Sequence, residues 1–343
     1  MVTKLNGVAT PEMMNAIRAE ATAEYKNAVP EATPFNLQEV GNPILAYNSV
    51  TNEFVDALVN KIIATIAYRM NWENPLSPLR KDAQPLGMDI EEVQTNPAKA
   101  QEYDGTNTGM AALLTVNKPD SKAAWYRLNR KDKYTVTIER ELLTNAFTSW
   151  DNLDNYIGQV VDSLYNGNTI DEYAYTKQLI TDAIDANHIN QFQVTNPVDQ
   201  ATSTEFAKEL RSLSVLFTFP STKYNNYVAM GGTGARTSWT PIDRQVILIS
   251  AKVATTVGFD VLSAAFNLSY SDYLARQIIV DEFDQNGKVL AVLTDTRAFQ
   301  IREKLRQFAT FYNPSALAWQ YYYHAWDTFS LSPFHNLIAL TTE

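Results

Sequence analysis

The pattern of apolar and polar residues changes its period between residues 134 and 186. Tyr134, Val136 and Ile138 alternate with polar residues, which is the period of two expected of a half-buried strand. From residue 149 to 186 the apolar positions recur every three or four residues instead. A continuous helix over 149–186 would be about 55 Å long at 1.5 Å per residue. The sequence therefore predicts a strand followed by an unusually long helix, of the kind that bridges parts of a molecule with separate cores.

The predicted long helix has a clear start and two weak points. Either Thr148 or Ser149 can cap its first turn, and Asp151 places a negative charge near the positive end of the helix dipole. Gly158 and Gly167 weaken the interior, so the helix could kink or split there.

The segment before this strand and helix has two parts. Residues 1–50 contain few large apolar residues and four prolines, so we expect this N-terminal arm to lie against another surface, such as a second copy of the chain. Residues 53–70 carry apolar side chains at a spacing of four, which predicts an amphipathic helix. The sequence begins with Met1, and we expect no cleaved N-terminal segment.

Residues 74–133 are rich in proline and polar residues, and a loop of this length is uncommon unless it is functional. Met88 and Ile90 lie on an alternating outgoing strand, and Trp125 together with residues 134–138 can pair with it on the way back. We therefore predict an extended two-stranded arm. Between residues 118 and 140 seven basic residues face three acidic ones, which suits contact with an acidic neighbour, although a solvated face is the plainer alternative.

The second half of the chain predicts a mixed body of helices and strands. A helix over 204–217 would be capped by Thr204 and would bury Leu216, and Phe259 to Phe266 reads as another helix. Short apolar runs typical of buried strands occupy 246–249, 277–283 and 289–293. Asp284-Gln285-Asn286-Gly287 predicts a hairpin turn between the last two runs. Residues 317–326 read as one long strand with aromatic residues on both faces.

Composition narrows the functional classes. The chain has 343 residues, of which 45% are hydrophobic, so it can bury a real core. It has no cysteine, which excludes disulfides and thiolate metal sites and favours synthesis in a reducing cytoplasm. The sequence shows no signal peptide and no membrane-spanning stretch. A net charge of -10 argues against a protein whose main task is to grip nucleic acid.

No motif in the sequence indicates catalysis, a cofactor or a metal. Gly231-Gly232-Thr233-Gly234 lacks the Lys-Ser/Thr of a phosphate-binding loop and reads as a flexible turn. Residues 282–293 resemble a calcium loop only weakly, because the closing carboxylate is missing. His324 reads as a structural histidine, and no spacing pairs it with His188 or His335. Acidic neighbours such as Glu91 and Glu92 point to opposite faces of a strand, so they do not form a catalytic pair.

The order of parts resembles the major capsid protein of tailed bacteriophages, with the Hong Kong 97 type of fold. The resemblance covers roughly residues 75–343, and four stretches within it strengthen it. They are YTVTIERELLTNAF at 134–147, VLSAAFNL at 261–268, QIIVDEF at 277–283 and YNPSALAW at 312–319.

The resemblance implies an α+β fold with an N-terminal arm (1–73), an extended two-stranded loop (74–140), a peripheral domain (141–224) with its spine helix, an axial domain (225–310) and a returning C-terminal strand (311–343). It also implies a structural role. Hexamers and pentamers of the chain would form an icosahedral head that encloses double-stranded DNA without sequence-specific binding. Scaffolding, portal and cement proteins would be partners, and the virion, assembled in the host bacterial cytoplasm, would be the location. No residue can be assigned to the covalent Lys to Asn crosslink of some members.

Eight residues are candidates for contacts between subunits. They are Met88, Ile90, Trp125, Tyr126, Arg127, Arg130, Lys131 and Lys133. Three alternatives stay open at this point. An encapsulin-like compartment would hold protein cargo within the same fold, a carboxylate-dependent hydrolase would be a small oligomer with a pocket, and a tail or adhesin subunit would form rings or fibres.

Overall fold

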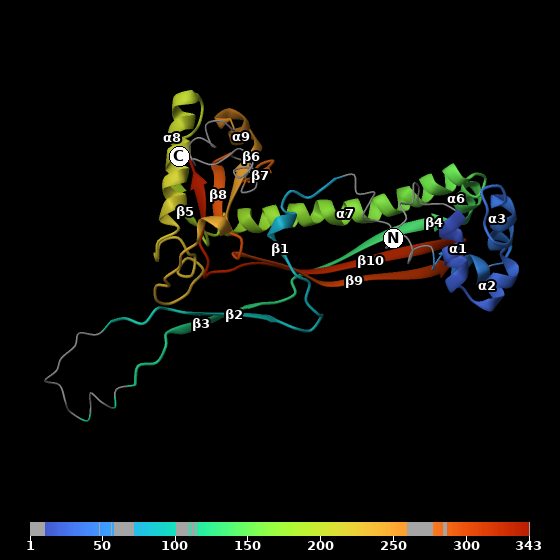
Figure 1. The fold of residues 1–343 in the computed structure, drawn as a ribbon, viewed down its shortest axis with the longest axis horizontal. Coiled ribbons are helices and arrows are strands. Elements are labelled where there is room, and N and C mark those ends of the chain that lie inside the picture. The colour runs from blue at the N-terminus through green and yellow to red at the C-terminus, as the bar shows by residue number, and fades with distance from the viewer. Residues whose placement is uncertain are drawn as a thin grey trace. The chain divides into compact units, whose positions relative to one another are not determined.

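The computed structural model describes residues 11–47, 49–55, 57, 72–100, 110, 114, 116–258, 277–283 and 287–342. The chain divides into two compact units. The first unit comprises Met1–Asn74, Lys131–Glu172 and Leu305–Trp326, and the second comprises Pro75–Arg130, Tyr173–Lys304 and Asp327–Glu343. Each unit therefore combines segments that are distant in the sequence, and its elements carry the labels of Figure 1.

The predicted long helix is confirmed as α7 (Trp150–Asp185), a single helix of 36 residues. Ser149 caps it, because its hydroxyl oxygen accepts a hydrogen bond from the Asn152 backbone N–H at 3.2 Å. The glycines do not split it. At Gly167 a Cβ atom would stand 3.4 Å from the Tyr134 ring, which is ordinary van der Waals contact, so the helix and the strand that carries Tyr134 pack here without needing a glycine. Residues 150–172 of α7 belong to the first unit and residues 173–185 to the second.

A four-stranded sheet packs against the first part of α7. Its strand order is β1-β9-β10-β4, with β1 (Arg80–Lys81), β9 (Phe299–Asn313), β10 (Ala318–Leu331) and β4 (Arg130–Glu139). β4 and β10 confirm the strands predicted at 134–138 and 317–326. Tyr323 of β10 stacks on Phe308 of β9 with ring centroids 4.6 Å apart, and Tyr165 of α7 lies 5.3 Å from Tyr323.

The N-terminal segment forms helices α1 (Pro11–Glu20), α2 (Ala23–Ala28) and α3 (Leu37–Ala46) in the first unit. Their buried side chains, including Ile17 and Ile44, share one core cluster with Leu143 of α6 (Arg140–Ala146) and with Trp319 of β10. The described part of this arm therefore lies against a surface of its own chain, because apolar side chains of the three short helices join a common core. Contact of the arm with another copy stays a prediction.

The second unit is built on a five-stranded sheet with the order β5-β11-β8-β6-β7. The strands are β5 (Asn190–Gln193), β11 (Leu337–Thr341), β8 (Val289–Asp295), β6 (Gln245–Ser250) and β7 (Gln277–Val280). β8 runs antiparallel to both β11 and β6, whereas β5 and β7 add parallel edges.

Both faces of this sheet are covered, so its central strands are apolar throughout. Leu248 and Val292 pack into the cluster that contains Ile180 of α7. Ile249 and Leu293 point the other way, into the cluster that α8 (Gln200–Leu216) and α9 (Ala251–Val257) complete. All seven residues of β8 are buried, as expected of a strand that lies between two layers.

The predicted hairpin between residues 277–283 and 289–293 is wrong. β6 lies between β7 and β8, and β7 pairs with β6 in parallel. A fully buried β8 needs a partner on each side, and β6 and β11 supply them. Residues 284–286 of the predicted turn lie outside the described residues.

The predicted helix at 204–217 is confirmed as α8, but it starts earlier and is capped differently. Asp199 accepts a hydrogen bond from the Thr202 backbone N–H at 2.8 Å, and the Thr202 side chain returns the bond in a capping box. Thr204 lies inside the helix and donates to the Gln200 carbonyl. Leu216, expected to be buried, is 43% exposed at the end of the helix.

Two further predicted helices, most of 53–70 and all of 259–266, lie outside the described residues. The expected turn at Gly231–Gly234 is present, with φ of 87° at Gly231 and 88° at Gly234, which only glycine adopts without strain. Within the described part of the chain, no helix combines the length and apolar character needed to cross a membrane.

Candidate functional site

A two-stranded ribbon in the second unit is the candidate site. β2 (Ile90–Thr95) and β3 (Ser121–Tyr126) pair antiparallel and lie side by side in Figure 1. The returning strand of the predicted arm is therefore β3 alone. Residues 134–138 belong to β4, which pairs with β10 in the four-stranded sheet.

The two faces of the ribbon differ in exposure. In the observed register Ile90 lies opposite Tyr126 and Glu92 opposite Ala124, so these residues share the inner face. The outer face consists of Glu91, Val93 and Thr95 of β2 and Ser121, Ala123 and Trp125 of β3. Val93 is 58% exposed and Trp125 is 57% exposed, so the outer face presents apolar surface to solvent.

Glu92 anchors the inner face to the loop that precedes β11. One carboxylate oxygen lies 2.7 Å from His335 Nε2, and the other accepts hydrogen bonds from the Tyr126 hydroxyl at 2.5 Å and the Ser332 hydroxyl at 2.7 Å. Burial alone would raise the pKa of Glu92, but these hydrogen bonds outweigh it and lower the pKa to about 2. Burial and the neighbouring carboxylate raise the pKa of Tyr126, so its hydroxyl stays protonated as a donor.

A second anchor holds the far end of the two strands. The buried Arg236 guanidinium donates to the Asp120 carboxylate at 2.6 Å and to the Asp120 carbonyl at 2.7 Å. The Asn96 side chain donates to the Ala235 carbonyl and accepts from the Thr237 N–H, both at 3.0 Å. Hydrogen bonds from Arg236 and Asn96 lower the pKa of Asp120. The ribbon is thus tied to the body at two points along its length.

A buried ion pair fixes the chain where it leaves the ribbon. Arg130 lies 3.1 Å from Asp327, and the two side chains are only 3% and 2% exposed. The Arg130 guanidinium also lies 4.8 Å from the ring centroid of Tyr175. Beside it, the Asn129 side chain bonds both the carbonyl and the N–H of Phe329. Directed polar contacts therefore fix the chain here beside the buried ring of Phe329.

Residues 14–341 match the family described as Phi29-like phage major capsid protein. The chain belongs to this family. It is 32% identical to the major capsid protein of Bacillus phage B103, with 99% of this chain and 74% of the relative covered. It is 28% identical to the major capsid protein of Streptococcus phage Cp-1, with 95% and 92% covered.

Solved structures agree on the fold. The capsid structure of Staphylococcus phage Andhra matches with a TM-score of 0.64 at 15% identity, and it covers 79% of this chain and 85% of its own. A chain in the structure of the head fibre and inner core protein of native bacteriophage P68 matches with the same TM-score, identity and coverage. These likenesses confirm the α+β, Hong Kong 97 type of fold. The capsid protein is a structural component of the virion, and its family is not one of enzymes.

The capsid protein buries three of the eight candidate contact residues within its own second unit. Ile90, Tyr126 and Arg130 belong to the ribbon face and anchors described above. The other five are Met88, Trp125, Arg127, Lys131 and Lys133, and all are exposed.

Sequence reasoning missed the anchoring residues. Glu92, Asp120, Arg236 and His335 come from four separate segments, and no local spacing links them. The alternation of β2 did predict that Glu91 and Glu92 point to opposite faces, and the structure confirms it. Among the described residues there is no group of three or more His, Asp or Glu side chains that could hold a metal ion.

Proposed function

We propose that this major capsid protein assembles with itself into hexamers and pentamers that close into an icosahedral head around double-stranded DNA. Its family membership supports a shell, and its net charge of -10 fits a container that holds DNA without gripping its sequence. In such rings each interface is heterologous, so a different surface of the chain meets each neighbour. Scaffolding, portal and cement proteins are proposed partners, and the host bacterial cytoplasm is the proposed place of synthesis.

The ribbon is the proposed clamp between neighbouring copies. The observation that carries this proposal is the contrast between its faces: the inner face is anchored through Glu92, while the outer face leaves Val93 and Trp125 in solvent. Exposed apolar surface of this kind marks sites of protein contact. A neighbouring copy that covers it would gain stability without disturbing the anchors.

We also assign the ribbon and the two units to the parts expected of a capsid subunit. We assign the ribbon and its connecting loop to the extended loop, and α7 to the spine helix of a peripheral domain. The first unit supplies much of that domain, and residues 1–73, described over 11–47, 49–55 and at 57 and 72–73, are the proposed N-terminal arm. The five-stranded sheet of the second unit supplies much of the axial domain. Residues 311–343 are the proposed returning segment, which ends in β11.

Shortening the ribbon tests the clamp. Residues 98–118 are replaced by Asn-Gly, which keeps both anchors because Asn96, Asp120 and β2–β3 are retained. We expect a folded chain with a wild-type thermal melting curve and at least a tenfold loss of closed particles, counted by electron microscopy after sucrose-gradient separation.

The control variant carries a Gly/Ser segment of equal length in place of residues 98–118. It separates the need for the native side chains from the need for length alone, and we expect it to lose particles as the shortened variant does. Normal particles from the shortened chain would show that the clamp does not need residues 98–118. Normal particles from a chain with Val93→Ser and Trp125→Ser would show that the outer face of the ribbon is not the clamp.

A further inference from the structure

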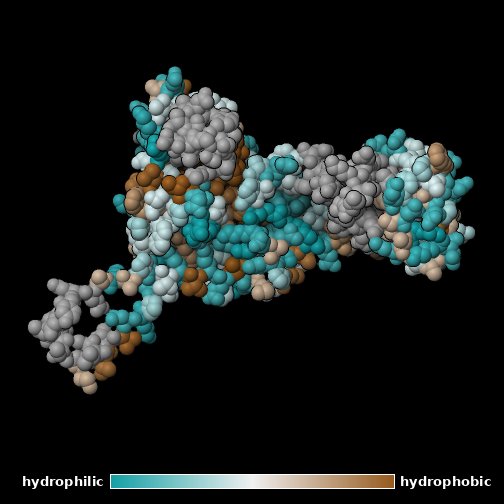
Figure 2. Space-filling model, in the orientation of Figure 1, coloured by the Kyte–Doolittle hydropathy of each residue, from teal (hydrophilic) through white to brown (hydrophobic). Residues whose placement is uncertain are grey.

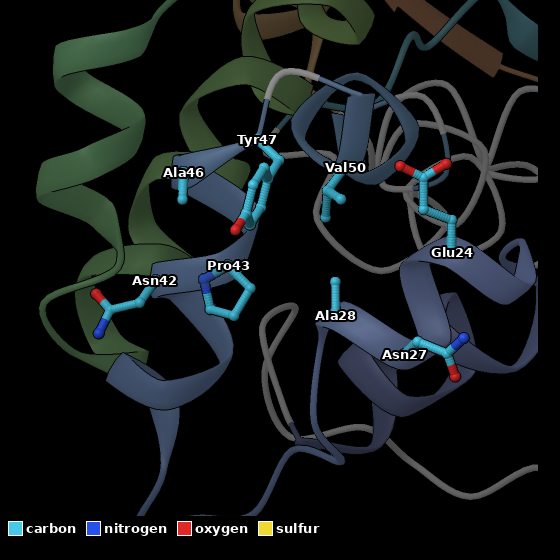
Figure 3. A pocket seen from close by; sticks show the side chains of 8 residues that line it. All are labelled: Glu24, Asn27, Ala28, Asn42, Pro43, Ala46, Tyr47 and Val50. Atoms are coloured by element: carbon cyan, nitrogen blue, oxygen red, sulfur yellow. The ribbon is translucent and has the colours of Figure 1, made fainter.

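Two cavities of the chain differ in the chemistry of their walls. The larger, with a volume of about 680 Å³, is the open groove between α2 and α3 shown in Figure 3. Its lining contains one charged side chain, that of Glu24, and the surface of α1–α3 in Figure 2 is largely hydrophilic. The smaller, with a volume of about 330 Å³, lies in the second unit and is lined by two arginines and an exposed tryptophan. The smaller cavity therefore offers more groups that can orient a charged, partly apolar ligand.

Three separate parts of the second unit form the walls of the smaller cavity. β2 of the ribbon forms one wall, residues 237–244 form a second, and Arg297 and His335 belong to the third. The Gln94 side chain of β2 donates a hydrogen bond to the Thr237 carbonyl at 2.9 Å, which joins the first two walls. The cavity is therefore held in shape before any ligand binds, and this lowers the cost of ordering it.

Arg244 places an unpaired positive charge at this cavity. It ends the 3₁₀ turn η3 (Ile242–Arg244), and its carbonyl accepts a hydrogen bond from the Thr296 N–H at 3.0 Å, which fixes the backbone. Its side chain is exposed, and no described carboxylate, including that of the preceding Asp243, forms an ion pair with it. The planar guanidinium of arginine can form two parallel hydrogen bonds with one phosphate group. Arg244 is therefore available to an anionic ligand.

The other charges near the cavity balance one another. Arg244 and Arg297 line the cavity, and Glu92 is the one carboxylate in its lining. Both oxygens of Glu92 already accept hydrogen bonds. Asp295, outside the lining, pairs with Arg297 at 2.7 Å, and Lys81 interacts electrostatically with both carboxylates. These carboxylates therefore offset Arg297 and Lys81, and Arg244 leaves the cavity with a positive charge that favours an anion.

Trp239 gives the same cavity a flat apolar surface. Its side chain is 49% exposed, although its neighbours Ser238 and Thr240 are buried. Nucleic-acid bases stack on aromatic side chains of this kind, and arginine is well suited to bind phosphate. An exposed indole ring and an unpaired guanidinium in one cavity therefore suit a ligand that has both an aromatic ring and an anionic group.

We propose that this cavity binds a nucleotide, whose base stacks on Trp239 and whose phosphate bonds Arg244. A nucleoside monophosphate joins the two groups that the walls select, a flat aromatic ring and an anion. The cavity volume of about 330 Å³ lies at the lower end of the range for small ligands, about 300–1,000 Å³. The whole cavity belongs to the second unit, so the inference does not rest on the proposed clamp.

Calorimetric titration of the unassembled full chain with dAMP tests the site. We expect saturable binding of dAMP that is at least tenfold tighter than the binding of 2′-deoxyadenosine or of inorganic phosphate, because each of these carries only one of the two groups. Equal affinity for dAMP and inorganic phosphate would reduce the cavity to a contact for any anion and would overturn the inference. The lack of saturable binding at millimolar dAMP would overturn it as well.

Two substitutions separate the parts of the site. Arg244→Gln removes the phosphate partner and Trp239→Leu removes the stacking surface, and both side chains are exposed, so we expect wild-type melting temperatures. Each should weaken dAMP binding about tenfold, which lies within the range for one stack of a base on an aromatic side chain. Arg211→Gln is the control, because Arg211 is an exposed arginine of α8 outside the cavity lining. Wild-type affinity in Arg244→Gln or Trp239→Leu would overturn the inference.

A free nucleotide and the end of a DNA strand share the chemistry that this cavity selects. A 5′-phosphorylated oligodeoxyadenylate and its 5′-hydroxyl counterpart, titrated into the same chain, separate the two sources. Tighter binding of the phosphorylated strand that is lost in Arg244→Gln identifies a strand end, whereas binding of dAMP without such a preference identifies a free nucleotide. If Arg244→Gln changes the binding of neither dAMP nor the phosphorylated strand, both sources are ruled out for this cavity.

Discussion

Removal of the Glu92 carboxylate tests whether the inner face of the ribbon is anchored as the geometry indicates. In Glu92→Ala, the hydroxyls of Tyr126 and Ser332 and the His335 ring lose their common partner. These groups belong to β3 and to the loop before β11, so the substitution removes one of the two anchors of the ribbon.

The loss of stability expected in Glu92→Ala follows from two separate arguments, one from its hydrogen bonds and one from its pKa. A hydrogen bond to a charged group contributes about 1.5–3 kcal/mol. The Glu92 side chain is 19% exposed, and a cavity of about 330 Å³ lies beside it. Water can therefore reach the donors that lose Glu92, so the total loss is smaller than the sum of three such hydrogen bonds. Independently, a folded pKa of about 2 against an unfolded value of about 4.3 corresponds to about 3 kcal/mol at neutral pH. We expect Glu92→Ala to lower the free energy of unfolding by about 3 kcal/mol.

Urea unfolding of the unassembled chain measures the global effect, and hydrogen exchange of the β2–β3 amides measures the local one. Protection of these amides should fall by about a hundredfold, which corresponds to about 3 kcal/mol. Glu91→Ala is the matched control, because Glu91 is the preceding residue on the exposed face and should change stability by less than about 0.5 kcal/mol. Equal effects of the two substitutions would refute the anchor.

Two other predictions concern charged groups. Because the folded pKa of Glu92 lies below its unfolded value, its contribution is complete above pH of about 4.3 and is lost as the pH falls through about 2. The stability difference between wild type and Glu92→Gln, from urea unfolding at stepped pH, should therefore shrink over this range; a constant difference down to pH 2 would contradict it. Asp327→Ala should cost about 3–5 kcal/mol, because the buried Arg130 loses its carboxylate. The double variant Arg130→Met with Asp327→Leu should lose less unfolding free energy than Asp327→Ala in the same urea assay. An equal or larger loss would show that the unpaired charge of Arg130 does not cause the destabilisation.

Strong local periodicity made parts of the fold predictable. The apolar spacing of α7 persists over ten turns, and the alternation of β4 and β10 is read directly from their residues. The helical spacing of α1 and α3, such as Leu37, Val40 and Ile44, runs over only ten residues in each helix, and their burial depends on side chains such as Trp319 from the far end of the chain. Tertiary packing, rather than local pattern, decides that region.

Local turn chemistry misled the assignment of β7 and β8. Asp284-Gln285-Asn286-Gly287 suits a tight turn, yet strand pairing is decided by which strand can be buried on both sides. In α8, Asp199 with Thr202 forms a better cap than Thr204, since it satisfies two backbone N–H groups at once. The anchors escaped prediction for a related reason: Glu92 and His335 are separated by 243 residues, and only the fold brings them together.

Strand alternation gives the two faces of the ribbon separate roles, and this makes the roles separable by experiment. The inner face uses the hydrogen bonds of Glu92, and the Arg236–Asp120 ion pair beside β3 holds the ribbon at its other end. The outer face keeps Val93 and Trp125 available for a neighbouring copy. Substitutions on the inner face should therefore appear in the stability of the single chain, and those on the outer face in particle yield.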